Sequence, residues 1–69
     1  MIRYFVEYID NGIAYETALL KSAEYATEIF NEQIEKGNLA NLIRWEQNPK
    51  FPDDEQKGFF TPIFETFQP

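Results

Sequence analysis

The dipeptide Asn11-Gly12 constrains the fold of this chain more than any other feature. Both residues tolerate the positive φ angles of a type I′ turn, which joins two antiparallel strands. The preceding residues alternate between two faces, with Ile2, Tyr4, Val6 and Tyr8 on one and Arg3, Phe5, Glu7 and Ile9 on the other. Alternation in β-branched and aromatic types is typical of a strand. The sequence therefore predicts a β-hairpin whose second strand covers about residues 13–20.

A helix is predicted after the hairpin, ending near Lys36. Ser22 is placed to cap it, because a serine hydroxyl accepts a hydrogen bond from a free amide of the first turn. Gly37 and Asn38 then supply residues that adopt the left-handed conformation with which helices close. The apolar positions recur at spacings of three and four residues: Ala23, Ala26, Ile29, Phe30 and Ile34. We expect this stripe to pack on the sheet.

A third strand is predicted over residues 41–46. Its side chains alternate, with Leu42 and Arg44 pointing opposite to Ile43 and Trp45. A crossover through the helix places this strand beside the first one, which makes the first strand central.

The C-terminal third of the chain has two different parts. Residues 48–58 contain two prolines and a run of charges, which predicts an irregular acidic loop. Residues 59–69 carry five large apolar side chains, namely Phe59, Phe60, Ile63, Phe64 and Phe67. Pro62 lies among them and restricts the segment to an edge strand or an extended stretch.

With 69 residues the chain is long enough for one small domain only. We predict an α+β fold of ββαβ type in residues 1–47, with a three-stranded antiparallel or mixed sheet and one helix on one face. The Phe-rich segment forms an extended tail or a short fourth strand. The sheet face away from the helix is expected to hold Phe5, Ile9, Leu20 and Leu42. One helix covers one face only, so the tail or a partner is needed to cover the other.

The composition excludes most catalytic chemistry. The chain contains no cysteine and no histidine, so it has no thiolate, no imidazole base and none of the usual zinc or haem ligands. Ser22 is expected at a helix cap without a base beside it. The acidic run Asp53-Asp54-Glu55 lacks the alternating spacing and the glycine of a calcium loop. We therefore predict a protein that is not an enzyme and that has no cofactor and no metal site. A carboxylate-only or metal-dependent enzyme is the distant alternative.

Charge and hydropathy restrict the partners. Twelve acidic residues against six basic ones give a net charge of −6, which repels nucleic-acid phosphates and anionic lipid surfaces. We predict a protein partner with a basic surface, and no direct binding to nucleic acid or membranes. The sequence shows neither the apolar core of a signal peptide nor a membrane span, so we expect a cytoplasmic location, in a bacterial or infected host cell.

The predicted helix carries an acidic stripe. Glu24, Glu28 and Glu32 recur every four residues, and Glu35 follows one turn later. One interpretation is a solvated face that keeps the protein soluble. The other is a row of carboxylates that occupies a groove built for phosphates. Tyr25 lies to one side of the apolar stripe and is the best candidate for an exposed anchor beside these glutamates.

A short motif overlaps the start of the tail. The sequence Gln56-Lys57-Gly58-Phe59-Phe60 resembles the pentapeptide with which extended segments dock on bacterial sliding clamps. It departs from that pattern where Phe59 replaces the usual leucine. The resemblance covers five residues of the chain and implies an extended, accessible segment.

Two functional hypotheses follow. In the first, the chain is an acidic protein-binding domain that contacts its partner through Glu24, Glu28, Glu32, Glu35 and Tyr25. Small size, acidity and lack of catalytic side chains resemble the inhibitors that phages encode against host nucleic-acid enzymes or defence complexes, by analogy of class. In the second, the chain is a structural or assembly module, for example a homodimer, that docks through Phe59, Phe60, Phe64 and Phe67.

Overall fold

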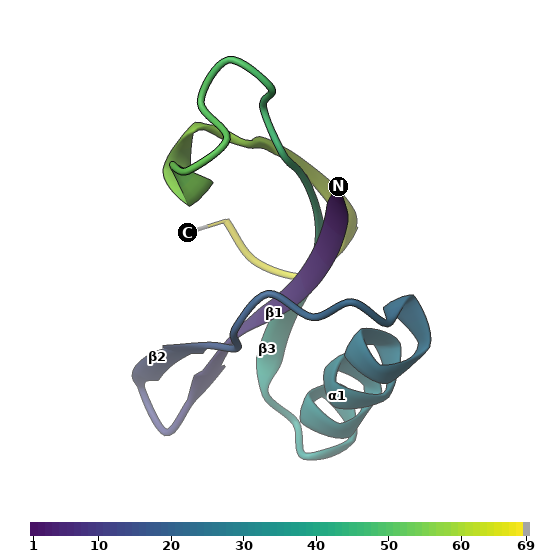
Figure 1. The fold of residues 1–69 in the computed structure, drawn as a ribbon. Helices are drawn as coiled ribbons and strands as arrows, with labels where there is room; N and C mark the ends of the chain where they lie inside the picture. Colours follow the sequence, from purple (N-terminus) through teal and green to yellow (C-terminus); the bar gives the residue numbers. More distant parts are fainter. Residues whose placement is uncertain (69) are drawn as a thin grey trace.

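The chain forms a four-stranded antiparallel sheet with one helix, as seen in a computed structural model that describes residues 1–68 (Figure 1). The elements are β1 (Ile2–Asp10), β2 (Ile13–Glu16), α1 (Ala23–Glu35), β3 (Leu39–Glu46), the 3₁₀ turn η1 (Glu55–Lys57) and β4 (Phe59–Glu65), and the strand order is β2-β1-β3-β4. The predicted small α+β class is confirmed. The sheet has four strands rather than three, because the Phe-rich segment pairs along β3.

The hairpin between β1 and β2 is confirmed, but β2 is shorter than predicted. Asn11 and Gly12 have φ angles of 53° and 78°, and Asp10 pairs with Ile13 across them. Regular pairing ends at Glu16. The chain nevertheless stays beside β1, because the main chain of Leu20 exchanges two hydrogen bonds with that of Tyr4. The second strand is thus interrupted near residues 17–19.

The helix begins and ends as predicted, but it is rotated relative to the predicted stripe. The Ser22 hydroxyl accepts a hydrogen bond from the Tyr25 amide at 3.0 Å, and Gly37 closes the helix at a φ of 84°. Ala26 and Phe30 are buried and Ile29 is half-buried. The third buried side chain is Gln33, while the predicted core residues Ala23 and Ile34 are exposed. Gln33 tolerates burial because its side-chain oxygen Oε1 accepts a hydrogen bond from the Asn38 side chain at 2.9 Å.

The sheet separates two hydrophobic clusters. Beneath α1 lie Val6, Ala26, Phe30, Ala40 and Leu42, and on the other face lie Phe5, Ile43 and Trp45. The predicted position of Phe5 is confirmed. The positions predicted for Leu20 and Leu42 were wrong, because Leu42 pairs with Val6 and Leu20 bridges to Tyr4, which places both on the helix side.

The loop of residues 47–58 covers part of the second cluster, on the side of the sheet away from α1 (Figure 1). The indole N–H of Trp45 donates to the Glu55 carbonyl at 2.9 Å. Asp54 caps η1 by accepting from the Gln56 amide at 3.0 Å. Gly58 then passes so close to Trp45 that a Cβ atom there would overlap the indole ring. The loop therefore provides part of this cover, and Phe60 of β4 adds to it by packing on Phe5.

A buried asparagine fastens the segment that follows β4. The Asn41 side chain is fully buried; its amide nitrogen donates to the carbonyl of Phe67 at 2.9 Å and to the carboxylate of Glu7 at 3.0 Å. Its oxygen accepts from the amides of Thr66 at 2.8 Å and Phe67 at 3.2 Å. The Thr66 hydroxyl also bonds both main-chain groups of Ala40. We call Asn41, Thr66 and Phe67 the Asn41 clasp.

Candidate interaction surfaces

The acidic side of α1 is exposed along its length. Glu24, Glu28, Glu32, Glu35 and Tyr25 are all exposed, and 54% of the Tyr25 surface is accessible. One cation faces this stripe, since the Lys36 ammonium lies 3.6 Å from the Glu32 carboxylate. The helix fold therefore brings the five predicted residues together on one solvent-facing element.

A second exposed surface runs along β4. Phe59, Phe60, Ile63 and Phe64 are each 44–55% exposed, and we call these four residues the aromatic strip. Phe60 meets Phe5 edge to face at 6.0 Å between ring centroids, and Phe64 stacks on Phe30 at 5.5 Å. The strip thus reaches both faces of the sheet. Phe67, predicted to belong to this surface, is half-buried, and its main chain is held by the Asn41 clasp.

The outer edge of β4 is interrupted where another strand would add. The main-chain groups of Ala40 face β4, because both bond to the Thr66 hydroxyl. The N–H and C=O groups of successive residues in a strand point to opposite edges. Ile43 is three residues after Ala40, so its main-chain groups face β1. Pro62 is paired with Ile43, and its main chain therefore points outward from the sheet. The N–H that proline lacks falls on the outer edge, next to a register shift. A partner is therefore expected to bind β4 through its side chains and not by adding a strand to its edge.

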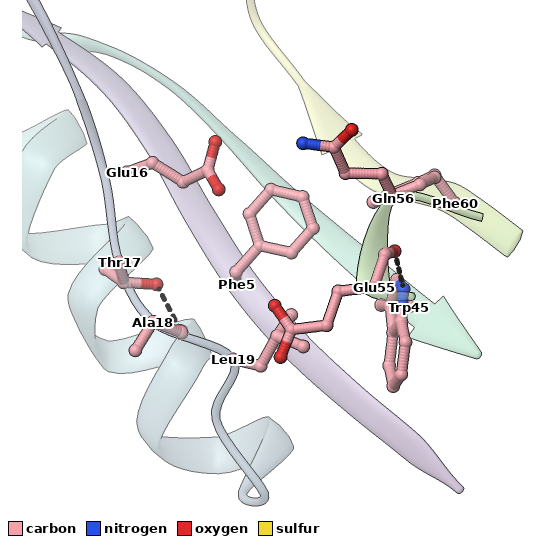
Figure 2. A pocket seen from close by; sticks show the side chains of 9 residues that line it. All are labelled: Phe5, Glu16, Thr17, Ala18, Leu19, Trp45, Glu55, Gln56 and Phe60. Atoms are coloured by element: carbon pink, nitrogen blue, oxygen red, sulfur yellow. Dashed lines mark hydrogen bonds between the residues drawn. The ribbon is translucent and has the colours of Figure 1, made fainter. Parts of the chain in front are cut away.

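A groove opens on the sheet face away from α1, and sequence reasoning missed it. Its volume is about 230 Å³, and its floor is formed by Phe5, Leu19, Trp45 and Phe60. Figure 2 shows Glu16 reaching it from the end of β2 and Glu55 from η1, with both carboxylates near Phe5. The groove depends on the interrupted second strand and on η1, neither of which has a clear local signal in the sequence.

A second cavity adjoins the groove and shares Leu19, Trp45 and Glu55 with it. Its volume is about 410 Å³, and it is lined by Arg3 and Asp53 as well. It therefore contains a cation of the chain's own, whereas the residues that line the groove include carboxylates and no basic side chain.

The remaining sequence motifs are part of the fold. Gln56 and Lys57 belong to η1 and Phe59 and Phe60 to β4, so the clamp-like pentapeptide is not an extended peptide in this structure. Within residues 1–68, no three acidic side chains are grouped so as to hold a metal ion. No helix in the described part of the chain is long and apolar enough to cross a membrane.

Comparison of the chain with protein-family models, with curated proteins and with solved structures finds no match.

Proposed function

We propose that the chain is a non-enzymatic assembly module that pairs with a second copy through the aromatic strip. The observation that supports this proposal is the exposure of four large apolar side chains on one edge strand. Large apolar side chains left exposed along one edge strand are typical of interaction sites, because their removal from water on association is favourable. Two copies related by a twofold axis bring the same patch together on both sides.

The charge of the chain sets how such pairing responds to salt. Each copy carries a net charge of −6, so two copies repel one another over a distance of about 10 Å at moderate ionic strength. Added salt screens this repulsion and leaves the burial of phenylalanine rings intact. Pairing through the strip is therefore expected to persist or strengthen as salt is raised.

Replacing Phe59 and Ile63 with threonine is expected to abolish self-association. Both side chains are about half exposed, and threonine retains a high strand propensity, so the free energy of unfolding should change by no more than about 1 kcal/mol. Sedimentation velocity over a concentration series measures the association. The matched control is Ile13→Thr with Leu39→Thr, two exposed apolar residues away from the strip. Equal association of the wild-type chain and the strip variant contradicts the proposal.

The acidic side of α1 supports a second candidate, an inhibitor-like domain that binds a basic partner. The observation that favours it is the half-exposed ring of Tyr25 beside Glu24 and Glu28, since tyrosine is enriched at the energetic centres of interfaces. The carboxylate row would supply electrostatic attraction and Tyr25 the apolar anchor. A nucleic-acid enzyme or defence complex is the class of target that fits, in a cytoplasmic setting.

Changing Glu24, Glu28, Glu32 and Glu35 together to glutamine tests this candidate. The fold should remain, because all four side chains are exposed and glutamine is also a good helix former. The rate of association with a basic partner should fall, and it should lose its dependence on salt concentration. Stopped-flow association at two salt concentrations measures this. Asp10→Asn with Asp53→Asn is a control that removes two negative charges away from the helix. Unchanged kinetics in the glutamine variant would rule out this surface.

A further inference from the structure

We infer that the groove lined by Phe5, Glu16 and Glu55 is a binding site for an arginine side chain presented by a partner protein. The groove lies on the sheet face away from α1, so it is separate from the acidic side of the helix. It also does not require that two copies of the chain associate. Its basis is the combination of an apolar floor with two carboxylates and no cation at one concave site.

The floor suits the stem and the plane of an arginine. Phe5 and Trp45 are almost completely buried, so they form a rigid base, and their edges line the groove. Phe60 is half exposed and is the ring available to a guanidinium, which stacks on aromatic faces. The methylene groups of the ligand then cover Leu19. Burial of these methylenes and stacking of the guanidinium favour an amphipathic cation over a bare ion.

The walls supply the charge. Glu16 ends β2 and Glu55 begins η1, and their carboxylates reach the same space from opposite walls (Figure 2). Among residues 1–68 neither carboxylate forms an ion pair; the ion pairs there join Lys36 to Glu32 and Arg44 to Glu46. A guanidinium has five N–H donors in one plane and can therefore bond carboxylates on two sides at once. An ammonium makes no comparable planar contact, which is why arginine is the better fit.

The chain's own cations leave the groove free. The Arg3 guanidinium donates to the Ile2 carbonyl at 2.8 Å and lines the adjoining cavity instead. The Lys57 ammonium lies over the Phe51 ring, 4.5 Å from its centroid, and is thus held within the loop. An arginine from another protein is thus the complement that the groove lacks.

The test uses N-acetyl-arginine amide as the probe and Trp45, the only tryptophan, as the reporter. The indole N–H of Trp45 donates to the Glu55 carbonyl, so occupation of the groove should shift the NMR signal of the indole proton and the fluorescence of Trp45 in a saturable manner. N-acetyl-citrulline amide has nearly the same shape without the charge. It should bind at least about tenfold more weakly, because the charge-assisted hydrogen bonds are lost.

Glu16→Gln with Glu55→Gln should weaken binding of the arginine probe by about tenfold or more. Asp10→Asn with Glu65→Gln removes the same charge at two exposed positions outside the groove and should leave binding unchanged. Urea unfolding of each variant verifies that the groove remains folded. The proposal is overturned if the wild-type chain gives no saturable shift, if both probes bind equally, or if the groove variant binds like the wild-type chain. The groove and the aromatic strip share Phe60. Their tests remain distinguishable, because pairing through the strip is measured by sedimentation with Phe59 and Ile63 changed, and arginine binding is measured with Glu16 and Glu55 changed.

Discussion

Asn41→Ala is expected to lower the free energy of unfolding by about 2–4 kcal/mol, a large share of the stability of so small a domain. The substitution removes four hydrogen bonds from a fully buried side chain and leaves the amides of Thr66 and Phe67 without their acceptor. The Asn41 side chain is fully buried and the hydrogen bonds to it are partly buried, so water replaces the lost bonds only in part and the loss is costly. Urea unfolding followed by circular dichroism measures the loss.

Asn31→Ala is the matched control for this prediction. Asn31 is exposed on α1, where alanine has the higher helix propensity, so stability should be unchanged or slightly raised. Hydrogen exchange gives an additional local readout. In the Asn41 variant the amides of residues 66 and 67 should exchange much faster, while those of the β1–β2 hairpin keep their relative protection. If the two alanine variants have the same stability, the Asn41 clasp contributes nothing to folding.

Gly58→Ala is expected to destabilise the fold by about 3 kcal/mol through steric overlap alone. Gly58 has a φ of −70° and a ψ of 174°, a conformation that alanine adopts readily. A Cβ atom would nevertheless overlap Nε1 of Trp45 and come within 2.9 Å of the Glu46 carbonyl oxygen. Trp45 is only 4% exposed and hydrogen-bonded, so it has little room to move away. A change in Trp45 fluorescence should accompany the loss.

A double-mutant cycle separates overlap from other causes. In a Trp45→Phe background the indole edge is absent, so Gly58→Ala should cost clearly less than in the wild-type chain. Gly37→Ala is the contrasting case: a Cβ there meets open space, but the φ of 84° makes the substitution unfavourable by about 1–2 kcal/mol. The Gly37 cost should be the same with Trp45 or phenylalanine at position 45. A Gly58 cost that does not depend on residue 45 contradicts the overlap explanation.

Local sequence signals predicted the ends of elements well. Asn11-Gly12, the Ser22 cap and Gly37 act through φ angles and hydrogen bonds within a few residues, and each has the predicted role. Pro62 likewise lies on an edge strand, as its missing N–H requires. Each of these features depends on the conformation of a few consecutive residues, so it can be predicted from the local sequence.

What sequence reasoning missed depends on register and on contacts between distant segments. Leu42 was assigned to the wrong face because its partner on β1 is Val6, and no local pattern states which residues pair across strands. Gln33 is buried in place of Ile34 because Asn38 offers a hydrogen bond after the helix has ended. The groove requires Glu16 and Glu55, which are 39 residues apart in the sequence, to line the same space. The helix glutamates and the strip were identified from composition and spacing, and their roles stay predictions.

The Asn41 clasp also orders events during protein synthesis. Thr66 and Phe67 follow Asn41 by 25 and 26 residues, so at ordinary translation speeds they are made roughly 1–5 s after it. During that interval β1, β2 and α1 have already been translated. The strand β3 does not yet have β4 beside it, and the side-chain amide of Asn41 does not yet have Thr66 and Phe67 as partners. Two nascent chains on adjacent ribosomes then each present an open strand, and neither yet has the Pro62 edge that discourages strand addition. The interval before β4 emerges is therefore when exchange of strands between chains is least hindered.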